Sequence, residues 1–351
     1  MNDPKAGDRI SNYVIDQQIG QGSFGQVFKA HHCILDQVVA IKIPTALQYV
    51  RNLRGEGITI HGLKHPNIVR AIDLDPYADP PYLIMEYVDG PSLRKILDDL
   101  NDPLPIGIAV EVLRGVLQAL EAAHEANVIH RDLKPANILV ARGEDPTDIR
   151  AEDIKVTDFG LGKVGGSTAA SMIQSGSLSN GEHQQLAGTI AYMAPEQRDG
   201  EDVDVRCDLY ACGVVLFEML TGRRPQGGDL PGQLRDDVPE PLNEVFRRCY
   251  THRDRRYTSA AEILADLDEL AQGPPVARRV GRVPRPPGAP CEKCGGPTRS
   301  GDQFCIHCGH QLVDIVPQCP SCHAYVQGSD RFCIFCGADL RRSDAGGEAF
   351  A

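Results

Sequence analysis

Residues 130–140 of the chain read HRDLKPANILV. An aspartate (Asp132), a lysine (Lys134) and an asparagine (Asn137) stand close together in this stretch, which ends in an apolar run. Asp132 is of the type found at catalytic sites, and Asn137 follows it five residues later.

A glycine-rich segment near the N-terminus, IGQGSFGQV at 19–27, has the pattern G-x-G-x-x-G-x-V between two predicted strands. Glycines let a backbone close over phosphate groups because they carry no Cβ atom. The strand–turn–strand context does not fit a dinucleotide-binding unit, in which a helix follows the glycines. Taken alone, the segment is better explained as a plain hairpin turn.

Three further motifs favour a phosphate-binding site over a plain turn. Residues 39–42, VAIK, place Lys42 at the end of an apolar strand, where burying an ammonium is costly unless it finds anionic partners. Asp158-Phe159-Gly160 follows the strand-like residues 154–156, and Ala194-Pro195-Glu196 closes the series.

In this order the motifs resemble those of the protein-kinase superfamily, in its eukaryotic-type (Hanks-type) Ser/Thr branch, which also occurs in bacteria. Their joint occurrence is far more specific than any one of them. The resemblance implies a bilobal α+β kinase domain at 10–271, with a β-rich N-lobe at 10–88, an α-rich C-lobe at 89–271, and ATP in the cleft between the lobes. Lys134, with Thr189 in GTIAYMAPE, is similar to the Ser/Thr-specific rather than the tyrosine-specific version.

The resemblance implies a role for each polar motif residue. Asp132 would accept or orient the proton of the substrate hydroxyl, with Lys134 beside it as a second catalytic residue. Asn137 and Asp158 would coordinate Mg²⁺, and Lys42 would hold the α- and β-phosphates of ATP. This set suffices because phosphoryl transfer depends mostly on positioning and electrostatics.

The resemblance also implies an ATP-binding surface, with Met85 as the gatekeeper. Glu86 to Val88 would form the hinge. The other expected ATP-binding residues are Ile19, Gly20, Gly22, Gly25, Val27, Ala40, Lys42, Glu56 and Leu139.

Four polar residues near the motifs are interpreted as structural. His130 is expected to be a packed residue rather than an acid–base group. Asp208 is similar to the buried acid that fixes the catalytic loop of the family, and Glu196 is expected to pair with Arg256.

The residue pattern also supports two lobes. Short β-leaning runs with turn residues between them occupy the first 90 residues: YVIDQQIG, QVFKAHH, QVVAIKI and PYLIMEYV. From about residue 106 apolar residues recur at helical spacing, in 112–120 and again in 263–270. A strand-rich part followed by a helix-rich part argues for α+β.

Composition excludes some classes of protein. The chain has 351 residues, 42% of them hydrophobic, and a formal net charge of −12, which disfavours binding to nucleic acid. The N-terminus lacks the apolar region of a secretory signal, and the longest apolar run, 209–217, is about half the length of a membrane span. We expect a soluble, cytoplasmic protein with no membrane partner.

Glu56 departs from the family pattern. It stands where the helix-C glutamate that pairs with Lys42 belongs, but Gly55 and Gly57 flank it, and each interior glycine costs a helix about 1 kcal/mol. We therefore predict a weak or mobile helix here, and the Lys42–Glu56 pair is the least secure assignment.

The segment between Asp158 and Glu196 is long and rich in Ser, Gly and Gln, which is typical of disorder before modification. Arg131 precedes Asp132, and in this family that arginine receives a phosphorylated residue. We hypothesise that a Ser or Thr between Ser167 and Ser179 is autophosphorylated and orders the segment against Arg131.

The C-terminal part contains a duplicated unit of 28 residues in which FCIHCG at 304–309 returns as FCIFCG at 332–337. A Pro- and Arg-rich linker at 272–290 precedes it. Each copy has the spacing C-x2-C-x10-C-x2-C, which resembles the double zinc ribbon family at 291–340, followed by a disordered tail at 341–351. The eight predicted zinc ligands are Cys291, Cys294, Cys305, Cys308, Cys319, Cys322, Cys333 and Cys336.

Each copy is too small to be stabilised by a hydrophobic core, and two bound Zn²⁺ ions would supply the missing folding free energy. Disulfide or redox use is the weaker alternative. Cys308 and Cys319 are also separated by ten residues, so spacing alone lets the middle two C-x2-C pairs share a metal, although the repeat favours pairing within each copy.

The leading hypothesis is a Ser/Thr protein kinase that transfers the γ-phosphoryl group of ATP to protein hydroxyls, with Mg²⁺, and carries a zinc-binding docking or regulatory tail. Its partners would be protein substrates and a protein that docks on the ribbons. The alternative is a pseudokinase scaffold that recruits partners through the ribbons. The glycines beside Glu56 favour it weakly, and the joint presence of Lys42, Asp132, Asn137 and Asp158 argues against it.

Overall fold

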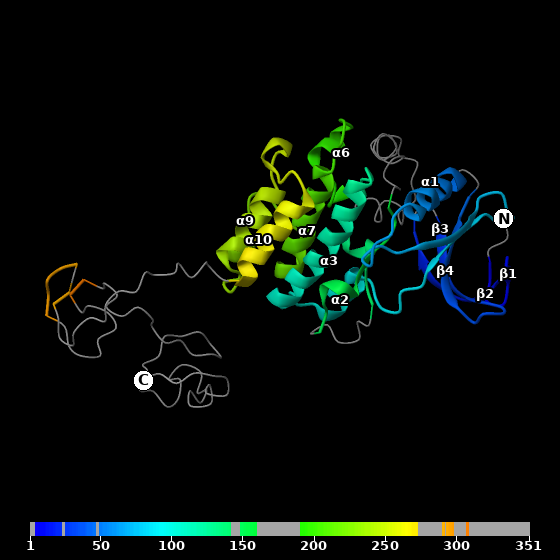
Figure 1. Cartoon of the computed structure of the whole chain (residues 1–351), viewed down its shortest axis with the longest axis horizontal. Coiled ribbons are helices and arrows are strands. Elements are labelled where there is room, and N and C mark those ends of the chain that lie inside the picture. The colour runs from blue at the N-terminus through cyan, green and yellow to red at the C-terminus, as the bar shows by residue number, and fades with distance from the viewer. Residues whose placement is uncertain are drawn as a thin grey trace, which may run out of the picture. The chain divides into compact units, whose positions relative to one another are not determined.

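The computed structural model divides into two compact units, Met1–Pro275 and Val276–Ala351. The division falls within the predicted linker. The structure describes residues 4–22, 25–46, 49–141, 148–159, 190–272, 290–291, 293–297 and 307–308. All of the described helices and strands belong to the first unit, with the strands gathered at one end and the long helices at the other (Figure 1).

The N-lobe is built on an antiparallel sheet with the strand order β1-β2-β3-β4-β6-β5. Its strands are β1 (Arg9–Ile10), β2 (Tyr13–Gln21), β3 (Gly25–His32), β4 (Val38–Pro44), β5 (Ala71–Asp75) and β6 (Tyr82–Glu86). One face buries Ile15, Phe28, Val39, Ile41 and Ile84. The four runs predicted as strands correspond to β2, β3, β4 and β6, and this prediction is confirmed.

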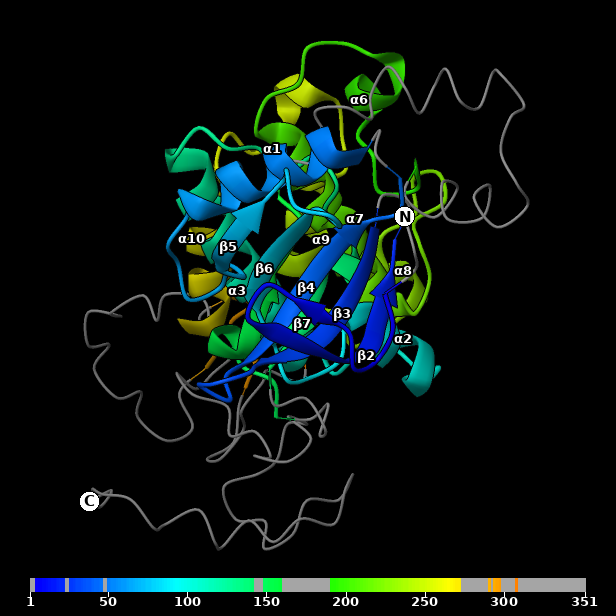
Figure 2. The same ribbon diagram turned by 90° about the vertical axis from the view of Figure 1, so that its right-hand side faces the viewer.

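The segment around Glu56 forms one continuous helix of 12 residues, α1 (Val50–His61), which packs against β4, β5 and β6 (Figure 2). The two glycines thus do not interrupt the helix, and its predicted weakness or mobility stays a prediction. Gly57 lies on the buried face of α1, where an added Cβ would stand 2.8 Å from Leu74 Cδ2 and 3.2 Å from Leu83 Cδ1. Gly57 thus lets the helix lie close to the sheet. Gly55 lies on the exposed face and has open space around it.

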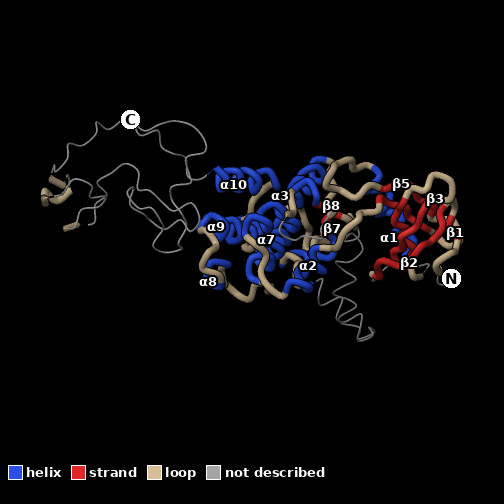
Figure 3. Tube along the Cα trace, turned by 90° about the horizontal axis from the view of Figure 1, so that it is seen from below, coloured by secondary structure: helices blue, strands red, loops and turns tan. Residues whose placement is uncertain are grey.

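The C-lobe is helical, with a two-stranded ribbon on the side of the N-lobe (Figure 3). Its helices are α2 (Leu93–Leu100), α3 (Ile106–Glu125), α6 (Pro195–Asp199), α7 (Arg206–Thr221), α8 (Pro231–Leu234), α9 (Glu240–Cys249) and α10 (Ala260–Gln272). The ribbon consists of β7 (Ile138–Val140) and β8 (Ile154–Val156). The helical spacing at 112–120 and 263–270 is confirmed by α3 and α10. None of the helices in the described part of the chain is both long and apolar enough to cross a membrane.

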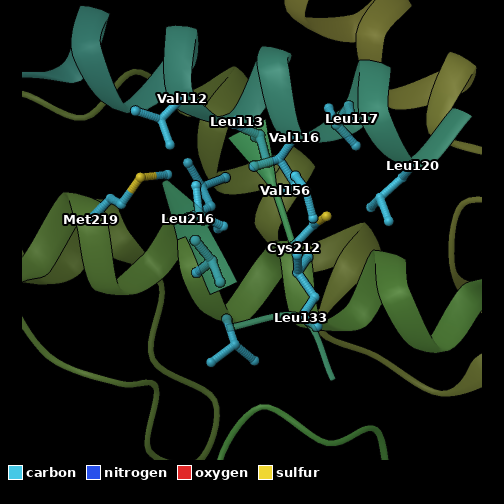
Figure 4. Close-up of a cluster of buried hydrophobic side chains, with 14 of the residues drawn as sticks. Val112, Leu113, Val116, Leu117, Leu120, Leu133, Val156, Cys212, Leu216 and Met219 are labelled. Atoms are coloured by element: carbon cyan, nitrogen blue, oxygen red, sulfur yellow. The ribbon is translucent and has the colours of Figure 1, made fainter. Parts of the chain in front are cut away.

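The C-lobe core forms around α7, which is buried at every residue from 207 to 220. The apolar face of α3, with Val112, Val116 and Leu120, faces Leu216 and Cys212 of α7 (Figure 4). Such close packing around a central helix fixes the loops that leave it. The thiols of Cys207, Cys212 and Cys249 are buried, as a core role requires, and burial raises the pKa of Cys249 to about 12.

The two glycines of α1 give a matched pair of substitutions. Gly55→Ala should raise the free energy of unfolding by up to about 1 kcal/mol, because alanine costs a helix less backbone entropy. Gly57→Ala should be less stable than Gly55→Ala, because Leu74 and Leu83 must move to admit the methyl group. Urea unfolding followed by helical circular dichroism measures both, and equal gains at the two positions would contradict the close packing of Gly57.

Candidate active site

A cleft with a volume of about 1390 Å³ lies between the two lobes. It brings together residues from the glycine-rich hairpin, the hinge, the catalytic loop and the end of β8. The predicted residues that line it are Ile19, Gly20, Gly22, Gly25, Val27, Ala40, Lys42, Met85, Glu86, Val88, Asp132, Lys134, Asn137, Leu139 and Asp158. Glu56 lies behind this wall, buried against Lys42.

The glycine-rich hairpin forms the upper edge of the cleft. The amide of Gly22 donates to the carbonyl of Gly25 across the turn at 2.8 Å. Gly25 is sterically required, because an added Cβ would lie 2.7 Å from the carbonyl oxygen of Ile43. Gly20 and Gly22 have room for a side chain. Packing therefore does not explain why these two positions lack side chains. Without side chains, their backbone is open to a phosphate group.

The walls of the cleft are apolar where a nucleotide base would lie. Val27 and Leu139 pack against a cluster that contains Ala40, Met85 and Val88. The residues come from both lobes, so the cluster closes the cleft from above and below. Predominantly apolar walls with a few polar groups are typical of small-molecule sites.

Lys42 is the centre of the polar side of the cleft. Its Nζ donates to both carboxylate oxygens of Glu56 at 2.8 Å and to Oδ1 of Asp158 at 2.8 Å. The Lys42–Glu56 pair, the least secure assignment, is thus present in the structure. Burial opposes the charge of Lys42, but Asp158 and Glu56 outweigh it and raise the pKa. Burial would raise the pKa of Asp158, but the attraction of Lys42 lowers it overall.

The catalytic loop holds its polar groups in a compact arrangement. Lys134 Nζ donates to Asp132 Oδ2 at 2.9 Å. The side-chain amide of Asn137 donates to the Asp132 carbonyl at 2.8 Å, which leaves the Asn137 amide oxygen available for another ligand. A 3₁₀ turn at Pro135–Asn137 and strand β7 follow directly, so the C-terminal end of the loop is fixed.

Asp208 of α7 holds the catalytic loop from behind. Its carboxylate accepts hydrogen bonds from the amides of His130 at 2.9 Å and Arg131 at 2.7 Å, and His124 Nε2 lies 2.8 Å away. These bonds help hold Arg131 at a φ of 68°. The structural interpretation of Asp208 is confirmed. His124 was not predicted, since nothing in its local sequence marks it as a partner of Asp208.

His130 is a packed residue, as expected. Its side chain is fully buried and its Nε2 lies 3.0 Å from the carbonyl oxygen of Thr157. Its ring also contacts the buried ring of Phe159, with the ring centroids 4.6 Å apart. Both contacts reach the segment on either side of Asp158, so His130 connects the catalytic loop to the Asp-Phe-Gly motif.

Two further ion pairs stabilise the site. Arg256 forms a buried, two-contact ion pair with Glu196, as the sequence predicts. Lys155 Nζ donates to Glu86 Oε1 at 2.5 Å and so joins β8 to the hinge. This second pair was not predicted, because its members are far apart in the sequence.

The donor set fits Mg²⁺ bound with a nucleotide. Asp158 and Asn137 present hard oxygen donors on the same cleft wall. Among the described residues Lys42 faces two carboxyl groups, and burial raises the pKa of Glu56 to about 8 against the attraction of Lys42. One cation therefore does not fully offset both carboxylates, and a divalent cation would add positive charge.

The second unit shows part of one zinc site. Ligand atoms of Cys291, Cys294 and Cys308 all lie within 4.8 Å of one another, and Sγ of Cys291 lies 3.7 Å from Sγ of Cys308. Gly295 adopts a φ of 68° directly after Cys294, and its amide donates to the carbonyl of Cys291 at 2.7 Å. This places Cys308 of the second C-x2-C pair beside the first pair, an arrangement that agrees with metal binding within the first copy.

Some predicted features lie outside the described residues. They are Gly160, Thr189, the proposed phosphorylation segment, the linker, the C-terminal tail, and five of the predicted zinc ligands, Cys305, Cys319, Cys322, Cys333 and Cys336.

Residues 13–271 match the protein kinase domain family, and residues 291–337 match the double zinc ribbon family. The chain belongs to the protein kinase family. The kinase is 34% identical over 289 residues to a probable serine/threonine-protein kinase of Streptomyces coelicolor, an alignment that covers 75% of this chain and 40% of the relative. It is 31% identical over 317 residues to serine/threonine-protein kinase PknB of Mycolicibacterium smegmatis, covering 82% of this chain and 48% of the relative.

The kinase also resembles the crystal structure of the Mycobacterium tuberculosis PknI kinase domain. The TM-score is 0.58 at 23% sequence identity, and the match covers 76% of this chain and 99% of that one. This likeness shows the bilobal fold that the sequence predicts. The chain spans less than half the length of the curated relatives described above.

Removing Lys42 should destabilise the kinase domain by more than its packing explains. Lys42→Met should lower the free energy of unfolding by about 3 kcal/mol, because the buried Glu56 carboxylate loses its cation. The double variant Lys42→Met/Glu56→Leu should recover part of the loss. Lys95→Met, which breaks an exposed pair with Asp99, should change stability by less than about 1 kcal/mol. Urea unfolding measures all three variants. A double variant no more stable than Lys42→Met would contradict the explanation that Glu56 is left buried without its cation.

Zinc content separates the two pairings of the ribbons. If each copy binds its own ion, Cys291→Ser and Cys308→Ser should each lose one zinc ion, and the double variant should lose no more than that one. If the middle pairs shared a metal, the two cysteines would belong to different sites and the double variant would lose both ions. Inductively coupled plasma mass spectrometry of the purified full chain gives the number of zinc ions bound per protein molecule.

Proposed function

We propose that the protein is an ATP- and Mg²⁺-dependent protein serine/threonine kinase. The observation that carries this proposal is that Lys42, Asp132, Asn137 and Asp158, which are spread over the chain, line one cleft between the lobes. The names of the relatives support it, since they are serine/threonine-protein kinases. The assignments of the individual residues below are part of the proposal.

The chain's own residues supply positioning and charge. Lys42, held by Glu56, would bind the α- and β-phosphates of ATP, and the bare backbone of the glycine-rich hairpin would cover them. Asn137 and Asp158 would hold Mg²⁺, which offsets the charge of the transferred phosphoryl group. Asp132 would orient the acceptor hydroxyl and receive its proton. Lys134 beside it would stabilise the negative charge on the group in transfer.

The pseudokinase alternative loses its supporting observation. It drew weak support from the glycines beside Glu56, which were expected to make the helix weak or mobile, but α1 is continuous and Glu56 contacts Lys42. A cleft with the complete set of polar residues favours the enzyme.

Arg131 supports activation by phosphorylation. Its Nε is buried and has no hydrogen-bond partner among the described residues. An unpaired buried donor of this kind is costly, and a phosphate group would satisfy it. We propose that a phosphorylated Ser or Thr from 167–179 fills this role.

The zinc ribbons are proposed to dock a protein partner or to regulate the kinase. Each ribbon is too small for a core of its own and would depend on bound metal to fold, which suits a compact docking module. We also propose that the protein acts in the cytoplasm, where reduced thiols are available to zinc.

A phosphorylation assay with radiolabelled ATP tests the enzyme proposal. Asp132→Asn should lower the transfer rate about 10²-fold or more, because the acceptor hydroxyl loses its proton acceptor. Asp158→Asn should also abolish transfer at ordinary Mg²⁺ concentrations, because it removes a charged metal ligand. Asp268→Asn, in α10 away from the cleft, is the matched control and should keep the wild-type rate.

Equal incorporation in all these proteins would defeat the enzyme proposal. Mass spectrometry of the same reactions locates the autophosphorylation sites. A fully active enzyme with no phosphate on 167–179 would rule out the role assigned to Arg131.

A further inference from the structure

The cleft includes a cluster of charged residues where α2 and the loop after α7 approach Tyr192. The cluster is defined by Arg94, Lys95, Asp98, Asp99, Tyr192 and Arg224, all of which line the cleft. Tyr192 belongs to the segment before α6, whereas the predicted nucleotide contacts come mainly from the N-lobe strands, the hinge and β7. The cluster therefore stands where a protein substrate, rather than the nucleotide, would lie.

Nearly every cation of this cleft already has a carboxylate partner. Arg94 pairs with Glu218 at 2.8 Å and with Asp98 at 2.7 Å. Lys95 pairs with Asp99 at 2.9 Å, and Lys134 pairs with Asp132 at 2.9 Å. These charges are neutralised within the protein, so none of these three cations is free to select a charged substrate residue.

Arg224 is different from these cations. It is exposed at the cleft, and within the described ranges its guanidinium has no hydrogen bond or ion pair. Its positive charge reaches the Tyr192 hydroxyl, where it opposes burial and Glu218, the causes that raise the pKa of that group. Arg224 is thus an unneutralised positive charge beside the segment that precedes α6.

The local backbone holds Arg224 in this position. Helix α7 ends at Thr221, and Gly222 follows in the left-handed conformation with a φ of 71°. The Thr221 hydroxyl lies 2.7 Å from the carbonyl oxygen of Phe217 and 3.0 Å from that of Arg223, so it shares its proton between the end of the helix and the turn. Pro225 comes next and favours an extended backbone at Arg224. The side chain therefore leaves from a fixed turn rather than from a free loop.

Glu218, the buried acid of this region, is not free to bind a basic substrate residue. Both of its carboxylate oxygens are occupied, one by Arg94 and the other by the hydroxyl of Tyr192. A basic substrate residue would have to break these bonds to reach it, whereas an acidic one meets Arg224 without displacing anything described in the structure.

We propose that Arg224 binds a carboxylate side chain of the protein substrate, so that this kinase selects acceptor serines and threonines with an acidic residue nearby. This inference rests on the proposed kinase function and adds the class of substrate.

A set of peptides with one serine tests the proposal on the full chain. A single aspartate is moved through each position on both sides of the serine in an otherwise neutral peptide. At one position the aspartate should raise kcat/KM about threefold to fivefold over alanine, mainly through KM, as expected of an exposed ion pair. The gain should shrink as salt is added.

Charge reversal assigns the effect to Arg224. Arg224→Ala should abolish the difference between the aspartate and alanine peptides, and Arg224→Glu should prefer lysine at the same position. Arg223→Ala is the matched control, because Arg223 is an exposed neighbour that does not line the cleft, and it should keep the wild-type preference. An aspartate preference that survives in Arg224→Ala would overturn the proposal, as would its absence in the wild type at every position.

Binding of the same peptides, labelled with a fluorophore and measured by anisotropy without ATP, gives a readout separate from catalysis. The wild type should bind the aspartate peptide more tightly than the alanine peptide, and Arg224→Glu should reverse this order. If that binding pattern holds but no peptide is phosphorylated, the kinase proposal fails and the anion-binding role of Arg224 stands. If peptides are phosphorylated with no charge preference in rate or binding, the role of Arg224 fails and the kinase proposal stands.

Discussion

The buried ammonium of Lys42 is the interaction on which the active site depends. It lies almost fully out of water at the end of β4, and burial of an unpaired ammonium there would be prohibitively costly. Glu56 and Asp158 remove that cost, but only if α1 packs on the sheet and if the end of β8 approaches the N-lobe. The Lys42 side chain therefore joins three elements that are distant in sequence. Lys42 can remain buried and charged only when these elements are arranged as they are in the cleft.

Asp208 has the corresponding role in the C-lobe, with the opposite charge. Its carboxylate is buried in α7, whose residues 207 to 220 are all buried, and accepts amide hydrogen bonds from the catalytic loop. Hydrogen bonds to a buried carboxylate are strong because the surroundings are poorly polarisable. Asp132 and Asn137 thus take their positions from the hydrophobic core rather than from the surface, which is the support that a preorganised site needs.

Sequence reasoning located the cleft residues because each belongs to a short motif, and it located β2, β3 and β4 because their apolar residues form short β-leaning runs. It missed β5, in which Asp73 and Asp75 dilute the apolar pattern and the strand exists through pairing with β6. It also expected Gly57 only to weaken the helix. Helix propensity takes no account of the sheet, which lies so close to α1 that a residue without a side chain fits best at this position. The His124–Asp208 and Lys155–Glu86 pairs could not be found, since each joins residues far apart in the chain.

Two backbone conformations show how the anchors act on the chemistry. Asp158 and Arg131 have φ values of 65° and 68°, in the left-handed region that costs a non-glycine residue about 1 kcal/mol. Each is held by one buried charged group. Asp158 forms an ion pair with Lys42, and the backbone amide of Arg131 donates to the carboxylate of Asp208. The two strained residues stand beside the ends of the cleft that are proposed to bind the metal and the acceptor hydroxyl. The packing of the two lobes thus keeps Asp158 and Arg131 in backbone conformations that neither would adopt in a free loop. Without Lys42 or Asp208, the residue that each one holds would lose the contact that stabilises its strained conformation.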